Sequence, residues 1–149
     1  MNYYSKVIIW LDIGELDMSN LTKPLGNYSH YRTVGNLVFL AGQGSRDIAT
    51  NKVAGLTHDQ DGKLVSYDIK AQTHGCIKNI SQVLESLNLT LKNLIDITVF
   101  LKNMSDFEQY NQIYNQYFNF DNPPTRTTIA VKDLPLENFI EIKAIASLE

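Results

Sequence analysis

The sequence predicts an α+β protein in which one mixed β-sheet carries two helices on one of its faces. Two segments have apolar residues at helical spacing, residues 66–88 and 105–118. Three later segments alternate apolar and polar residues as half-buried strands do, residues 94–103, 126–132 and 139–147. With a β-rich first half, the order of elements is β-rich, α, β, α, β, β.

The composition suits one folded domain over residues 1–149. Hydrophobic residues make up 44% of the chain and charged residues 19%, which is typical of a globular protein rather than a disordered one. The sequence contains no internal repeat and no low-complexity linker that would divide it.

The first half of the chain contains two polar loops, residues 17–29 and 46–63, with a predicted β-hairpin between them. In the hairpin, "YRTVGNLVFLAGQG" (31–44), apolar segments flank Gly35-Asn36, a dipeptide that accepts the positive φ of a two-residue turn. The second loop ends in a predicted turn at Asp61-Gly62.

The helix predicted over residues 66–88 has a single apolar stripe. Ser66 or Asp68 can cap its N-terminus. Gly75 lies in mid-helix, where it costs roughly 1 kcal/mol relative to alanine, so we expect it to allow close contact with the sheet. The stripe consists of Ile69, Cys76, Ile80, Val83, Leu84 and Leu87.

The strand and helix that follow are also defined by periodicity. The strand at 94–103 is expected to direct Ile95, Ile97, Val99 and Leu101 to one face and Asp96, Thr98 and Phe100 to the other. The helix over 105–118 begins with an S-x-x-E capping box formed by Ser105 and Glu108. Pro123-Pro124 then separates this helix from the last two strands.

Both helices are expected on one face of the predicted sheet, so the second face, which also carries apolar residues, receives no helix from this chain. An apolar face left uncovered by its own chain must meet another surface, so the sequence predicts self-association.

Composition also limits the possible partners. The net charge is −3, the pI is about 5.6, and no lysine or arginine cluster exceeds two residues, so no nucleic-acid grip is expected. The lone Cys76 excludes an internal disulfide. The apolar run "VIIWL" (7–11) is too short to span a membrane. Residues 7–13 are instead a candidate strand.

"MNYYSK" lacks the pattern of a signal peptide, so we expect a cytoplasmic protein.

Three residues are candidates for chemistry, each with a structural alternative. Arg126 follows a rigid Pro-Pro segment and could clamp a carboxylate with its planar guanidinium, or it could be a surface arginine at a strand end. Glu141 lies in the apolar strand "FIEIKAIA" and could be a general acid or base, or a solvent-facing residue like Lys143 on the same face. Tyr28 could donate a hydrogen bond to a substrate or simply pack in its loop.

No metal or cofactor is predicted. His30, His58 and His74 lack metal-ligand spacing, and the sequence contains neither a phosphate-binding nor a dinucleotide-binding fingerprint. Cys76 falls on the apolar stripe of its helix and is expected to be an inert core thiol.

Several segments together resemble the RidA/YjgF/UK114 family of imine and enamine deaminases. They are "GNYSH", "LVFLAGQGS", the long block from "QTHGCIKNIS" to "QIYNQYF", and "PPTRTTIAVKDLPLENFIEIKAIA". The last segment is similar to the family signature, in which an arginine follows a proline-containing turn and an E-I-x-x-x-A strand closes the chain.

The resemblance implies a chorismate mutase-like fold that assembles as a homotrimer around a central barrel, with ligand sites in the clefts between subunits. It implies that Arg126 binds the substrate carboxylate and that Glu141 orients and activates water. A backbone group near Thr128 would hold the imine nitrogen or the water. Tyr28 would reach the site from the neighbouring subunit, close to the Gly42-Gln43 loop.

Departures from the family pattern bear on the substrate. Asn27 replaces the usual proline of the G-P-Y-S motif, and Thr128 stands where many relatives have cysteine. The loop before Arg126 is short and resembles the 2-aminomuconate deaminase-like subgroup. Because 2-aminomuconate carries two carboxylates, we expect a second cation, one of Arg32, Arg46 and His30, to face the cleft.

These expectations define three competing functions. The first is metal-free hydrolysis, without a cofactor, of a small carboxylate-bearing enamine or imine such as 2-aminoacrylate, 2-iminobutyrate or 2-aminomuconate. The second is a trimer of the same kind that binds a small carboxylate without turnover. The third is a ribonuclease, which the acidic pI and the absence of a histidine pair disfavour.

Overall fold

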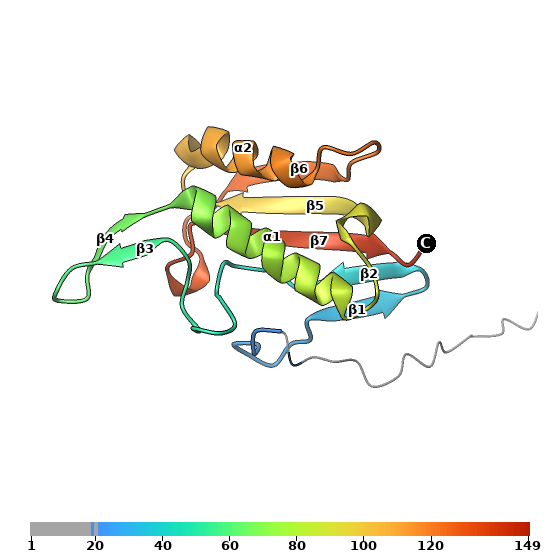
Figure 1. The fold of residues 1–149 in the computed structure, drawn as a ribbon, viewed down its shortest axis with the longest axis horizontal. Helices are drawn as coiled ribbons and strands as arrows, with labels where there is room; N and C mark the ends of the chain where they lie inside the picture. The colour runs from blue at the N-terminus through green and yellow to red at the C-terminus, as the bar shows by residue number, and fades with distance from the viewer. Residues whose placement is uncertain (1–18, 20) are drawn as a thin grey trace, which may run out of the picture.

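The computed structural model describes residues 19 and 21–149, and the candidate strand at 7–13 lies outside them. Five strands form one mixed sheet in the order β1-β2-β7-β5-β6, and β3 and β4 form a separate hairpin. Figure 1 shows both helices on the same face of the large sheet, as predicted. The strands are β1 (Tyr31–Val34), β2 (Leu37–Leu40), β3 (Leu56–His58), β4 (Leu64–Tyr67), β5 (Leu94–Leu101), β6 (Thr125–Ala130) and β7 (Ile140–Ser147); the helices are α1 (Ile69–Glu85) and α2 (Phe107–Tyr117).

The pairing pattern explains why the sheet is mixed. β7 lies in the centre and pairs antiparallel with both β2 and β5. β6 is an edge strand and pairs parallel with β5, with α2 as the connection between them. The predicted hairpin is present as β1 and β2, and Gly35 takes its positive φ of 58° at the turn.

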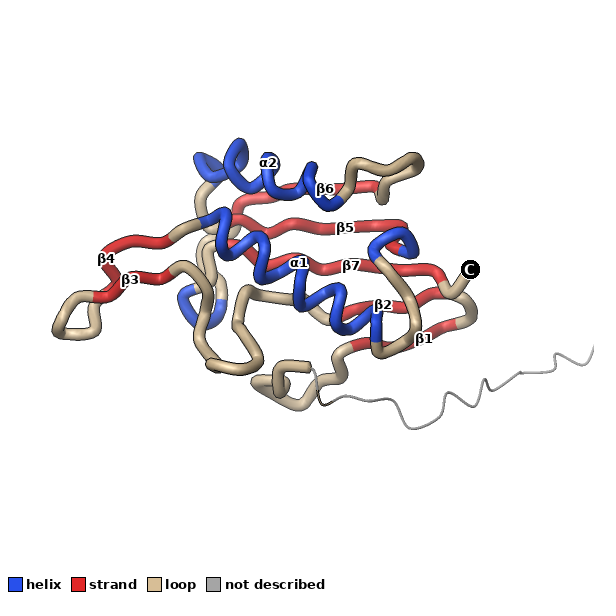
Figure 2. Tube along the Cα trace, in the orientation of Figure 1, coloured by secondary structure: helices blue, strands red, loops and turns tan. Residues whose placement is uncertain are grey.

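The prediction of a continuous loop over 46–63 was wrong in its second half. β3 and β4 pair around a turn in which Gly62 has a φ of 78°, and this hairpin projects beyond the end of the large sheet (Figure 2). Ser66 belongs to β4, so the cap of α1 is Asp68, whose carboxylate accepts from the amides of Lys70 and Ala71.

Helix α1 buries the predicted stripe, including the Cys76 thiol, which is fully buried with its pKa raised by desolvation. Gly75 has a different neighbour from the one expected. A Cβ at this position would lie 2.8 Å from the Cβ of Ser45, so the glycine admits the loop after β2 rather than the sheet.

Strand β5 departs from simple alternation at its start. The register shifts between Leu94 and Asp96, and this bulge leaves Ile95 43% exposed. Ile97, Val99 and Leu101 are buried as predicted. The strand ends at Leu101, so the expectation that it extends to residue 103 was wrong.

The predicted capping box of the second helix was also wrong. A 3₁₀ turn over Met104–Asp106 precedes α2, and the helix begins at Phe107 without a side-chain cap. Asp106 instead accepts a hydrogen bond from the Tyr67 hydroxyl at 3.0 Å. This contact ties the start of α2 to the β3–β4 hairpin.

The face of the sheet opposite the helices is open within one chain. Phe39 is 38% exposed and Ile129 42% exposed on this face, as expected for a surface that another copy could cover. Within the described part of the chain, none of the helices is long and apolar enough to cross a membrane.

Candidate functional site

The strand register separates two of the predicted site residues. Arg126 pairs with Ile97 of β5, and Glu141 pairs with Phe100 of the same strand. Successive side chains of a strand point to opposite faces, so partners of positions 97 and 100 lie on opposite sides of the sheet. Arg126 is on the helix-covered face, and Glu141 is on the open face.

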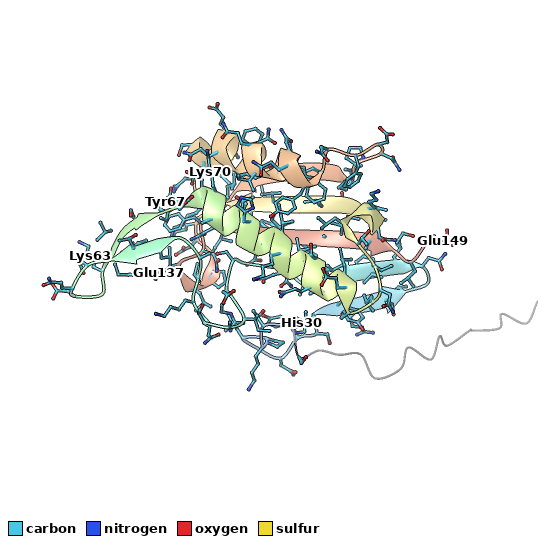
Figure 3. All side chains as sticks on the ribbon, in the orientation of Figure 1. His30, Lys63, Tyr67, Lys70, Glu137 and Glu149 are labelled. Atoms are coloured by element: carbon cyan, nitrogen blue, oxygen red, sulfur yellow. The ribbon has the colours of Figure 1, made fainter. Side chains whose placement is uncertain are left out.

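Six of the predicted residues line one cavity of about 90 Å³ near the start of β7. They come from the loop before β1, the segment after β2, and β7. They are Tyr28, His30, Gly42, Gln43, Arg46 and Glu141. Figure 3 labels His30 beside β1, at the end of the loop that also carries Tyr28.

Gly42 allows the Glu141 carboxylate to reach this cavity. A Cβ built on Gly42 would lie 2.3 Å from Oε1 of Glu141, so no other residue leaves room for the carboxylate in this position. Glu141 is partly buried, and desolvation raises its pKa. A carboxylate that loses its proton less readily than usual can exchange one nearer to neutral pH.

Arg46 provides positive charge on the cavity wall. Its Nη1 donates to Oδ1 of Asn51 at 2.7 Å, and its Nη2 donates to the carbonyl of Lys23. The neighbouring His30 is buried, and both desolvation and Arg46 lower its pKa. At neutral pH this favours a neutral imidazole, so Arg46 is the cation on this wall.

Two buried asparagines, which sequence reasoning missed, hold the segment that carries Gly42 and Arg46. Asn138 accepts from the Ser45 amide at 2.9 Å and from its hydroxyl at 3.1 Å. Asn79 of α1 donates to the carbonyls of Gly44 at 2.8 Å and Arg46 at 2.9 Å. Gln43 pairs through its backbone with Ile142 of β7 and lines the cavity.

Arg126 lies apart from the cavity, beneath α2. Its Nη1 donates to Oδ1 of Asn111 at 2.8 Å, and its guanidinium carbon lies 4.3 Å from the centre of the Tyr114 ring and 5.6 Å from that of Tyr110. Such stacking orients the guanidinium plane. Tyr110, Asn111 and Tyr114 were not singled out from the sequence, because aromatic residues at helical spacing are typical of a helix face that packs on the core.

Thr128 lies on the same face of β6, two residues after Arg126. Its Oγ1 is 2.6 Å from the Tyr110 hydroxyl. Burial raises the pKa of the neighbouring Tyr114 to about 12, so its hydroxyl stays protonated at neutral pH. Arg32 belongs to neither group: it is exposed, opposite Phe39 on the open face of the sheet.

The remaining histidines line neither the cavity nor the surroundings of Arg126 and have other partners. His58, at the end of β3, lies 3.0 Å from the carboxylate of Glu137, which Figure 3 labels beside the β3–β4 hairpin, and Nδ1 of His74 lies 2.7 Å from the Tyr117 hydroxyl. Among the residues described, no three histidine, cysteine or acidic side chains are grouped so that they could hold a metal ion.

Comparison with known proteins assigns the chain to a family. Residues 18–148 match the family described as Endoribonuclease L-PSP. A RutC family protein of Pyrococcus horikoshii is 38% identical over 130 residues, which cover 87% of this chain and 94% of the relative. The chloroplastic Reactive Intermediate Deaminase A of Arabidopsis thaliana is 36% identical over 124 residues, which cover 83% of this chain and 60% of the relative.

Solved structures agree with this assignment. The crystal structure of the YjgF gene product of Escherichia coli superposes with a TM-score of 0.75 at 26% identity, covering 90% of this chain and 98% of that one. The sequence matches and the shared fold establish that this protein belongs to the Endoribonuclease L-PSP family, which includes the RidA and YjgF proteins.

Proposed function

We propose that this protein is a hydrolytic deaminase of small enamines and imines that carry a carboxylate, releasing ammonia and a keto acid. The name of the Arabidopsis relative supports deamination as the activity. The proposal depends on the environments of two charged side chains, Arg126 and Glu141. Arg126 is oriented by Asn111 and Tyr114, and forms no ion pair within the described residues; Glu141 is partly buried with a raised pKa.

The chemistry assigns one task to each group. An enamine tautomerises by taking a proton on carbon, and the resulting C=N bond is open to attack by water. Glu141 accepts a proton from the attacking water as the C–O bond forms, and returns it to the nitrogen to give a carbinolamine. A second proton then passes through Glu141 from the new hydroxyl to the amino nitrogen as the C–N bond breaks, so that ammonia leaves and the carbonyl forms. Arg126 holds the substrate carboxylate with paired N–H donors and so fixes the reacting carbon.

The two faces of the sheet make a subunit cleft the natural place for this reaction. Arg126 and Thr128 cannot meet the Glu141 cavity within one chain, because the sheet lies between them. A homotrimer that packs the open, apolar faces around a central barrel would bring Arg126 of one protomer to Tyr28, Gly42 and Glu141 of the next.

The substrate would be a short imine such as 2-iminobutyrate or 2-aminoacrylate, or the dicarboxylate 2-aminomuconate. Arg46 favours the dicarboxylate, because it places a second cation on the wall of the cavity that holds Glu141. In this arrangement Arg126 and Arg46 would each receive one carboxylate.

The test is ammonia release from enzymatically generated 2-iminobutyrate, 2-aminoacrylate and 2-aminomuconate. Removal of a buried charged contact typically costs about 2–5 kcal/mol, so Arg126→Ala should lower kcat/KM by roughly 30-fold to several thousand-fold. A decrease in kcat/KM of less than threefold would show that Arg126 does not bind the substrate carboxylate. Saturable binding of 2-oxobutyrate without turnover of any substrate would instead identify a non-catalytic carboxylate-binding protein.

The family description also names an endoribonuclease activity. The net charge of −3 gives this activity little support here, and His58 and His74 form no pair, since His58 bonds to Glu137 and His74 to Tyr117. RNA cleavage that copurifies with the protein and is lost in Arg126→Ala and Glu141→Gln would favour it over deamination.

A further inference from the structure

One side chain of α2 contacts both of the predicted site residues on β6. Tyr110 is fully buried, its ring lies 5.6 Å from the guanidinium carbon of Arg126, and its hydroxyl lies 2.6 Å from Oγ1 of Thr128. Arg126 and Thr128 are two residues apart on one face of an edge strand, so a single side chain above them can reach both.

An edge strand needs this kind of support. β6 pairs only with β5 in the sheet. Within the described residues its other edge has no strand partner, so its position relative to α2 depends on side-chain contacts. The Tyr110–Thr128 hydroxyl pair joins α2 to β6 at the middle of the strand. Arg126 is thereby held against the faces of Tyr110 and Tyr114 while Asn111 occupies one of its nitrogens, and its remaining N–H donors stay available.

We propose that Tyr110 is a positioning residue, which sets the guanidinium of Arg126 and the backbone at Thr128 through the hydroxyl pair and its ring. This inference rests on the proposed function, since it takes Arg126 as the group that binds the carboxylate. The hydroxyl is the part of Tyr110 that matters, because a phenylalanine would keep the same buried ring but remove the hydrogen bond to Thr128, while the contacts of Asn111 and Tyr114 with Arg126 would remain.

The chain offers a matched control on the same helix. Tyr117 also has its hydroxyl in a hydrogen bond, 2.7 Å from Nδ1 of His74, but it lies away from both Arg126 and the Glu141 cavity. Tyr117→Phe therefore deletes the same atom from the same helix without touching the site. Thr128→Ser keeps a hydroxyl for Tyr110, whereas Thr128→Val removes it.

The experiment measures the Kd for 2-oxobutyrate by calorimetry and kcat/KM for 2-iminobutyrate, with circular dichroism melting to verify folding. Loss of a hydrogen bond of ordinary strength should raise the Kd and lower kcat/KM by roughly 3- to 10-fold in Tyr110→Phe, relative to both wild type and Tyr117→Phe. Thr128→Val should match Tyr110→Phe, and the double variant should lose no more than either single variant. Thr128→Ser, which restores a hydroxyl, should recover most of the loss seen in Thr128→Val.

The outcomes separate this inference from the proposed function. If wild type binds and turns over substrate while Tyr110→Phe stays within twofold of Tyr117→Phe, Tyr110 is a core residue and the inference falls alone. It falls alone, too, if the losses of Tyr110→Phe and Thr128→Val add in the double variant. If wild type neither binds 2-oxobutyrate nor releases ammonia, the proposed function falls and takes the inference with it.

Discussion

Arg126 and Glu141 lie on opposite faces of one β-sheet. Both are anchored in register against β5, Arg126 opposite Ile97 and Glu141 opposite Phe100. The odd spacing of these two partners turns one side chain toward α2 and the other toward the open face. In the proposed reaction, a substrate that touches both residues would lie between two copies of the chain.

Complementation between inactive variants tests this arrangement. Coexpressed Arg126→Ala and Glu141→Gln protomers should assemble into mixed trimers in which about a quarter of the sites contain both intact residues, and ammonia release should recover to about that fraction of wild type. Each variant alone serves as the control. Activity no higher than that of the single variants would show that one protomer supplies both residues.

Arg46 should select for a second carboxylate. Arg46→Ala is expected to lower kcat/KM for 2-aminomuconate roughly tenfold more than for 2-iminobutyrate, because only the dicarboxylate loses an ion pair. The ratio of the two substrates cancels any loss of folded protein. Arg32→Ala, on the open face, should leave the ratio unchanged, and an equal loss on both substrates in Arg46→Ala would argue against the second-cation role.

The raised pKa of Glu141 should appear in stability as well as in activity. Below the ordinary carboxyl value of 4.5 the group is protonated in both the folded and unfolded states, and above its raised folded pKa the ionised form opposes folding. Glu141→Gln should therefore raise the melting temperature at pH 7.5, and this gain should fade as the pH approaches 4.5. A constant difference across this range would mean that burial does not perturb Glu141.

Gly42 should control activity more than stability. A methyl group at this position would meet Oε1 of Glu141 at 2.3 Å, and the end of that side chain can swing away with little cost to the fold. Gly42→Ala should lower kcat roughly tenfold or more by displacing the proton acceptor, with little change in melting temperature. Gly26→Ala is the control, since its added methyl would meet Tyr28 at an ordinary 3.7 Å. Full activity in Gly42→Ala would show that Glu141 is not the proton acceptor.

Periodicity predicted most of the fold because the core residues repeat regularly. The stripe of α1 and the burial of Ile97 follow from spacing, and Asp68 was one of the two residues predicted to cap α1. The misses occur where local order is broken by tertiary contacts. The bulge at the start of β5 leaves Ile95 exposed, and a 3₁₀ turn, in which Asp106 bonds to Tyr67, stands where the capping box was predicted.

The candidate site was less accessible from the residues alone. Arg126 and Glu141 were visible as charges in apolar strands, but their facing depends on the register against β5, which spacing within one strand does not give. Asn79 and Asn138 carried no signal, because a buried amide that holds a loop looks like any polar residue until its partners are known.

The order of the chain gives the two groups of site residues different folding requirements. Tyr110, Asn111, Arg126 and Thr128 come from consecutive elements, α2 and β6, which close over a short stretch of chain. The cavity around Glu141 needs the Gln43–Ile142 bridge, which closes a much longer stretch of chain and therefore carries a larger loop-closure entropy. The residues proposed to hold the carboxylate are therefore joined by local contacts, whereas those proposed to act on water come together only when the last strand enters the sheet.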